Sequence, residues 1–202
     1  MVDVLGRYTG EVREARLFTR MLLALGERAA KAAVSGREHP FRADFPHPVS
    51  VNALALEGGG ELVCVANLGE REGEGVFEEN GLRVRVRAKD CVLLPVGVPF
   101  GGGVIAAANC EIYSLSPLVL YGEGGHDVRL NIGGKEYRAE KSGVYGGVSV
   151  TILTKEEMAE RDERETGGFS YSSDKSVLSH FPVRVGDAPG FPAYKASGKD
   201  CS

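Results

Sequence analysis

The chain contains no tryptophan, and aromatic residues make up only 7% of it. Its four cysteines, Cys64, Cys91, Cys110 and Cys201, lie far apart and form no Cys-x-x-Cys pair. This spacing excludes the common zinc and thiol–disulfide motifs. We interpret Cys64 and Cys91 as small buried apolar residues in strands, with a disulfide or a metal role as the alternatives.

Long apolar runs and an excess of one charge are also lacking. The longest apolar stretch near the start covers residues 21–25 and is flanked by charged residues, so it is too short for a membrane span and lacks the layout of a signal peptide. The formal net charge is -4, the pI is about 5.7, and acidic and basic residues are interleaved. We therefore expect a cytoplasmic protein that binds neither membranes nor nucleic acid.

No complete catalytic or metal-binding motif is present. The sequence has no Gly-x-Ser-x-Gly, phosphate-loop or His-Glu-x-x-His pattern. The histidines are His39, His47, His126 and His180, of which His39 and His47 could meet across a proline-rich stretch but without an evident third ligand. The sequence thus predicts no catalytic residue, no cofactor and no metal site, and it favours a chain that is not an enzyme on its own.

Carboxylates leave one alternative open, because a glycosidase needs only two of them across a cleft. Most glutamates here follow glycine-rich turns or belong to a charged helical segment, which favours solvated surface charge. These positions are Glu70, Glu72, Glu74, Glu123, Glu156, Glu157, Glu160 and Glu163.

The pattern along the chain divides it into five segments. Apolar residues at spacings of three and four predict one long helix over residues 11–34, within an N-terminal segment 1–36. We then expect a proline-rich connector at 37–48, a β-sandwich domain at 49–154, a short charged helix at 155–166, and an extended or partly disordered tail at 167–202.

Short β-rich runs separated by glycines fill residues 49–154. Leu82, Val84 and Val86 alternate with arginines, which predicts a strand with one buried face, and Gly133-Gly134 predicts a two-residue hairpin turn. Because no helices separate the strands, the expected fold is mainly β: an antiparallel β-sandwich, or a distorted barrel, with the long N-terminal helix and the short charged helix.

Sugar binding by a β-domain depends on its aromatic residues, since sugars stack on exposed rings. Without tryptophan, the candidates for carbohydrate contact are Tyr113, Tyr121, Tyr137 and Tyr145. All four lie in or beside predicted strands, so packing in the core or at a sheet edge is the alternative.

Three stretches resemble the β-galactosidases of glycoside hydrolase family thirty-five. Residues 6–17, GRYTGEVREARL, are similar to the last helix of that family's catalytic barrel. Residues 61–69 and 91–96 resemble the first β-domain after the barrel. Residues 109–115 and 118–122 resemble a strand with a central Glu that leads to a Leu-Tyr-Gly turn. Together these stretches lie within roughly residues 6–165.

The resemblance implies a non-catalytic role, because the catalytic barrel of that family has no counterpart in this sequence. In that family both catalytic glutamates come from barrel strands, and this sequence begins at about the barrel's final helix, so no residue inherits a catalytic role. The leading hypothesis is a non-catalytic accessory or assembly domain related to β-galactosidase-like hydrolases. The resemblance implies either a separately encoded remnant or an excised portion of a larger hydrolase, and the domain would pair with a copy of itself or with a separate barrel-bearing hydrolase chain. A carbohydrate-binding module, and a small independent glycoside hydrolase, are the alternatives.

Overall fold

The computed structural model describes residues 10–45 and 47–165. Its helices are α1 (Gly10–Leu25), α2 (Glu27–Ala30) and α3 (Lys155–Glu165). The first seven strands are β1 (Ala33–Val34), β2 (Phe41–Asp44), β3 (Ser50–Ala55), β4 (Glu61–Asn67), β5 (Gly73–Phe77), β6 (Arg83–Val86) and β7 (Asp90–Phe100). The remaining strands are β8 (Gly103–Ala108), β9 (Glu111–Leu115), β10 (Leu118–Gly122), β11 (Val128–Ile132), β12 (Lys135–Ala139), β13 (Gly143–Tyr145) and β14 (Val148–Thr154).

The fold is mainly β and sandwich-like, as the sequence predicts. The strands form a seven-stranded sheet in the order β1-β3-β4-β7-β8-β11-β12, a four-stranded sheet β13-β14-β10-β9, and a three-stranded sheet β2-β5-β6. Adjacent strands are antiparallel except β10 and β14, which are parallel. This parallel pair differs from the purely antiparallel core that the sequence predicts, because β11 to β13 come between the two strands along the chain.

The seven-stranded sheet is the central layer of this arrangement. On β4, successive residues alternate between its two faces: Leu62 packs in one core with the four-stranded sheet and α1, whereas Val63 and Val65 pack in a second core with the three-stranded sheet. The alternating apolar residues Leu82, Val84 and Val86 belong to this second core, and each of their side chains is at most 2% exposed. The predicted buried face of this strand is therefore confirmed.

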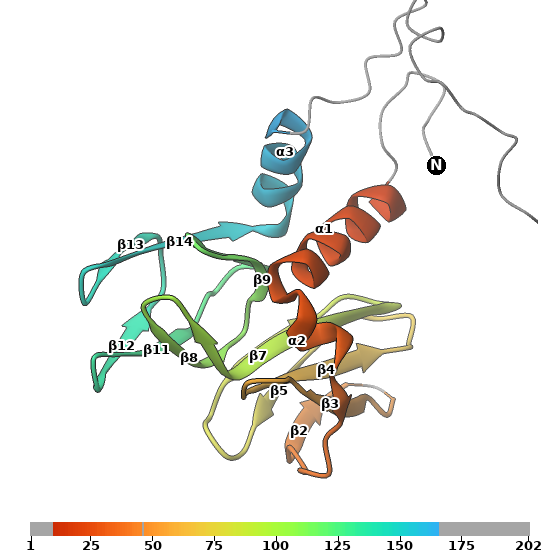
Figure 1. The fold of residues 1–202 in the computed structure, drawn as a ribbon. Helices are drawn as coiled ribbons and strands as arrows, with labels where there is room; N and C mark the ends of the chain where they lie inside the picture. Colours follow the sequence, from red (N-terminus) through yellow and green to blue (C-terminus); the bar gives the residue numbers. More distant parts are fainter. Residues whose placement is uncertain (1–9, 46, 166–202) are drawn as a thin grey trace, which may run out of the picture. The chain divides into compact units, whose positions relative to one another are not determined.

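A third core joins the four-stranded sheet to the helices. Leu17 of α1 and Met158 of α3 pack against Val119 and Tyr121 of β10. Figure 1 shows α1 and α3 on the same side of this sheet, next to β9 and β14. No helix in the described ranges is long and apolar enough to span a bilayer.

Two predicted boundaries are corrected by the structure. The long helix ends at Leu25 because Gly26 adopts a φ of 55°, which leaves the right-handed helical region, and the chain then forms only α2 before β1. The connector at 37–48 contains strand β2, whose hydrogen bonds run only to β5. An edge strand tolerates flanking prolines, which explains why Pro40 and Pro48 do not prevent it. The predicted tail at 167–202 lies outside the described residues.

Candidate functional site

Two of the four predicted carbohydrate-contacting tyrosines face the helices. Tyr121 is only 2% exposed and packs beside Leu17, so it offers no ring face to a sugar. Tyr113 donates its hydroxyl to the Asp162 carboxylate at 2.9 Å, and the Arg20 guanidinium lies 5.9 Å from its ring centroid. The predicted carbohydrate contact of Tyr121 is therefore wrong, because α1 and α3 cover the strand β10 that carries this residue.

The other two tyrosines lie on β12 and β13. Tyr137 and Tyr145 are partly buried against the main core. A Cβ atom at Gly146 would stand 3.1 Å from the Tyr137 ring, which places that ring beneath the β13–β14 turn. The Tyr145 hydroxyl donates to the Lys141 carbonyl at 2.8 Å. The four tyrosines are thus divided between two regions and form no common platform.

A buried lysine at the start of α3 is the centre of one charged cluster. The Lys155 ammonium lies 2.8 Å from Glu14 Oε2, 3.2 Å from Asp90 Oδ2 and 4.0 Å from Glu123 Oε1. Burial alone would lower the pKa of Lys155, but the hydrogen bond to Glu14 and the nearby carboxylates outweigh it and raise the pKa. Glu123, expected at the solvated surface, instead has its Oε1 atom buried in this cluster. The cluster ties α1 and α3 to β7.

Glu111 of β9 adds a carboxylate that titrates near neutral pH. Burial raises its pKa to about 7, against the lowering effects of the Leu93 backbone N–H, which donates to Oε1 at 3.0 Å, and of the Lys155 charge. A carboxyl group with such a pKa can donate or accept a proton at physiological pH. In the sequence, this position could have been recognised as a charged residue between two apolar residues, Cys110 and Ile112, which are both fully buried.

A second charged cluster joins α1 directly to α3. Asp162 is 2% exposed and accepts hydrogen bonds from Arg16 and Arg20, each at 2.8 Å, and from the Tyr113 hydroxyl. Burial would raise the pKa of Asp162, but these three hydrogen bonds lower it. Sequence reasoning missed this cluster because Arg16 and Arg20 are 146 and 142 positions from Asp162, and Tyr113 is 49 positions from it.

A histidine and two glutamates converge beside β2. His39 Nδ1 lies 2.8 Å from Glu79 Oε1, and His39 Nε2 lies 3.1 Å from Glu61 Oε2. The Ser35 hydroxyl also donates to Glu61, so the serine faces a carboxylate and not the imidazole. Nucleophilic catalysis requires the base beside the hydroxyl group. This arrangement therefore lacks the order of a catalytic triad and instead anchors the segment before β2.

The remaining sequence candidates take separate places. His47 Nε2 lies 2.8 Å from the Asn67 side-chain oxygen, so His39 and His47 have different partners. Cys64 is half-buried and Cys91 is exposed, which corrects the expectation that both are buried. Within residues 10–45 and 47–165, no group of three His, Cys, Asp or Glu side chains is placed to hold a metal ion.

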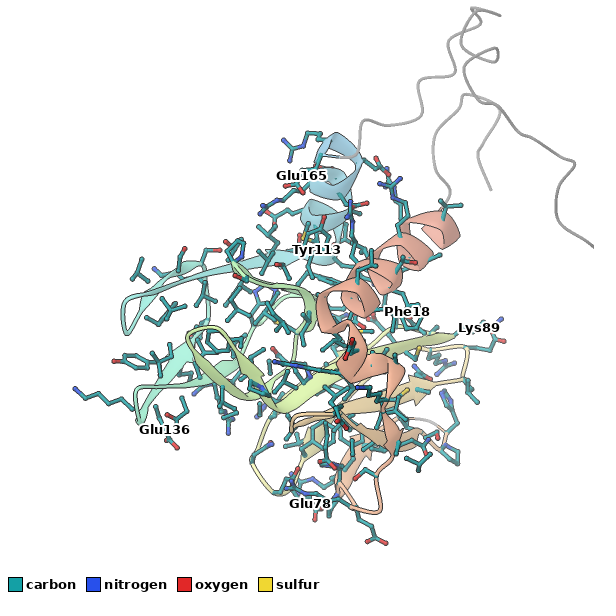
Figure 2. All side chains as sticks on the ribbon, in the orientation of Figure 1. Phe18, Glu78, Lys89, Tyr113, Glu136 and Glu165 are labelled. Atoms are coloured by element: carbon teal, nitrogen blue, oxygen red, sulfur yellow. The ribbon has the colours of Figure 1, made fainter. Side chains whose placement is uncertain are left out.

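The outer face of α1 carries exposed apolar side chains. Leu17, Met21 and Leu25 are at most 3% exposed, whereas Phe18, Leu22 and Leu23 are 47%, 40% and 69% exposed. In Figure 2, Tyr113 lies on the α3 side of α1 and Phe18 lies on the opposite side. We call Phe18, Leu22 and Leu23 the docking face. Phe18 and Leu22 are one turn apart beside the buried stripe, and Leu23 projects about 100° further around the helix, so α1 carries apolar side chains that the described structure does not cover.

Comparison with known proteins adds no assignment, since no family model, curated protein or solved structure matches this chain.

Proposed function

We propose that this chain is a non-catalytic module of a β-galactosidase-like glycoside hydrolase assembly, and that its docking face binds a separate, barrel-bearing hydrolase chain. The observation that carries the proposal is the exposure of Phe18, Leu22 and Leu23 on a helix whose other side is fixed to the module. Exposed apolar side chains gathered on one element mark protein-binding surfaces, and aromatic residues are common anchors there.

The rigidity of α1 supports this role. Arg16 and Arg20 bind the buried Asp162 carboxylate, and Glu14 binds the buried Lys155 ammonium. These contacts hold the helix in place before any partner arrives. Binding therefore costs little additional ordering of the helix, which favours affinity.

The family resemblance indicates which surface the docking face fits. Residues 6–17 resemble the last helix of the catalytic barrel, and α1 begins within this stretch. A helix from the outer ring of such a barrel packs against the barrel with one face and against the next domain with the other. The covered side of α1 corresponds to the contact with the β-module, so the docking face corresponds to the contact with the barrel.

Co-purification with a barrel-bearing hydrolase chain, expressed from the reading frame immediately upstream, tests the proposal. We expect a stable complex, and we expect Phe18→Asp with Leu23→Asp to weaken it by at least about 2 kcal/mol, roughly thirtyfold in Kd. Leu68→Asp is the matched control, because Leu68 is 80% exposed and lies in the β4–β5 connection.

Two results would contradict the proposal. One is a complex that survives the double substitution in α1 unchanged. The other is a dimer of this chain, measured by light scattering, that the same substitutions dissociate while no barrel chain binds. In that case the docking face would serve self-association.

A further inference from the structure

A groove lies where the central sheet extends beyond the three-stranded sheet. The three-stranded sheet packs over β4 and β7, whereas β11 and β12 continue past it. Two adjoining hollows of about 830 and 530 Å³ occupy this place, and both are lined by Arg129 and Arg138. Both hollows are open to solvent and are large enough to admit a small molecule.

A buried aspartate organises the middle of the groove. Asp127, whose side chain is 11% exposed, binds Arg138 through two hydrogen bonds at 2.9 and 3.1 Å and binds Arg129 at 3.0 Å. Arg129 also donates to the Asn80 carbonyl at 2.5 Å, which connects β11 to the turn between β5 and β6. Both guanidinium groups are therefore held in fixed positions, and each keeps further N–H donors.

The groove is balanced in charge. Its four arginines face four carboxylates, so neither an anion nor a cation is favoured as the ligand. These residues are Arg37, Arg83, Arg129, Arg138, Glu79, Asp127, Glu136 and Glu140.

Free hydrogen-bonding groups surround an apolar floor. The side chains of Asn131 and Glu136 are exposed, pair with each other in the β11–β12 register, and have no hydrogen-bond partner in the described part of the chain. Between them and the β5–β6 turn, the floor is made of small apolar residues such as Val104 and Ala106. An apolar strip with planar polar groups on its sides matches the apolar face and the peripheral hydroxyls of a sugar ring.

We propose that this groove binds a short neutral oligosaccharide. Hydroxyl groups both donate and accept hydrogen bonds, so they can satisfy the guanidinium groups, Asn131 and Glu136 together. A peptide cannot extend the sheet within the groove, because β7, β8 and β11 beneath it are paired on both sides; the open edge of the sheet at this end is on β12. Of the four tyrosines, only Tyr137 lines the groove, and the site is independent of the docking face.

Nuclear magnetic resonance titration of the full chain tests this site. The probes are neutral tetrasaccharides from galactan, xylan, mannan and glucan, with tetragalacturonate and a tetra-alanine peptide for comparison. We expect at least one neutral saccharide, at up to about 10 mM, to shift the signals of Val104, Ala106 and Asn131. The double substitution Asn131→Ala with Glu136→Ala should weaken binding about tenfold. Arg85→Ala is the control, because Arg85 is an exposed arginine on β6 paired with Glu72.

The outcomes are separable. Shifts with tetragalacturonate alone, or with the peptide alone, would overturn the choice of ligand, and no shift with any neutral saccharide would overturn the site. Equal saccharide binding by the wild type and the Asn131/Glu136 variant would also overturn the site. The Asn131/Glu136 variant should still bind the barrel-bearing chain, so failure of this inference is distinguishable from failure of the proposed function.

Discussion

Glu111 and Asp162 are two carboxylates buried under the same pair of helices, yet their pKa values move in opposite directions. Asp162 receives hydrogen bonds from Arg16, Arg20 and Tyr113, and its pKa falls. Glu111 accepts a hydrogen bond from the Leu93 backbone N–H, is hydrogen-bonded to the Tyr121 hydroxyl and shares Lys155 with other acids, and its pKa rises to about 7. At Asp162 two cationic donors and a hydroxyl outweigh the effect of burial on the pKa, whereas at Glu111 burial outweighs the Leu93 N–H and the Lys155 charge.

The two shifts give opposite dependences of stability on pH. Folding lowers the pKa of Asp162, so its contribution is present above its ordinary pKa of 3.8 and is lost as the pH falls through the lower folded value. Folding raises the pKa of Glu111 from 4.5 to about 7, so the folded state binds this proton more tightly. Stability through Glu111 therefore decreases as the pH rises from 4.5 to 7, and it stays at that lower level above pH 7.

We expect the largest change in stability from Asp162→Ala, which removes the carboxylate that accepts hydrogen bonds from three side chains. Arg16, Arg20 and Tyr113 lose their shared acceptor, and the contact between α1 and α3 is broken. We expect a loss of about 3 to 5 kcal/mol in the free energy of unfolding at pH 7, measured by urea denaturation. Glu160→Ala, an exposed position on the same helix, is the control. Similar losses for both variants would refute the role of the cluster.

A smaller effect of opposite sign is expected from Glu111→Gln. Glutamine keeps an acceptor for the Leu93 N–H but carries no charge to bury. We expect this variant to exceed the wild type in unfolding free energy by up to about 3 kcal/mol at pH 8, and by little at pH 5. Urea denaturation from pH 5 to 9 measures the difference, and a constant difference across this range would contradict the assignment of the titration to Glu111.

The smallest effect is expected from Arg13→Ala. Arg13 pairs with Glu163 at 2.6 Å across the same two helices, but its side chain is 42% exposed. Exposed ion pairs contribute little and are screened by salt, so we expect a loss of about 0.5 kcal/mol that shrinks further in 1 M salt. A loss comparable to that of Asp162→Ala would show that burial does not separate these two pairs.

The sequence predicts the strands well because their signals are local. Gly133 and Gly134 have φ values of 59° and 78° and form the predicted turn between β11 and β12. The end of α1 was missed because Gly26 lies within an apolar spacing that continues to Ala29, and a single glycine does not always end a helix. The parallel pairing of β10 with β14 was missed because a local sequence pattern does not indicate which distant strands pair with each other.

The functional surfaces were harder to predict because they depend on contacts between distant segments. Lys155 and Glu14 look like ordinary solvated charges in the sequence, and only the packing of α3 beside α1 brings them together. Arg129 and Arg138 also look like surface charges, since nothing in the sequence places Asp127 between them. The apolar pattern of α1 predicted a helix that needs partners, but it did not indicate which side remains exposed.

The pairing of β14 with β10 also sets an order on folding during synthesis. β10 can pair with β9 once residue 122 has left the ribosome, but its other edge stays open until residues 148–154 follow. The hairpin of β11 and β12 can form in the interval, because its contacts are local. The four-stranded sheet therefore closes late, and a chain truncated before Val148 would keep the apolar strand β10 as an unpaired edge prone to aggregation.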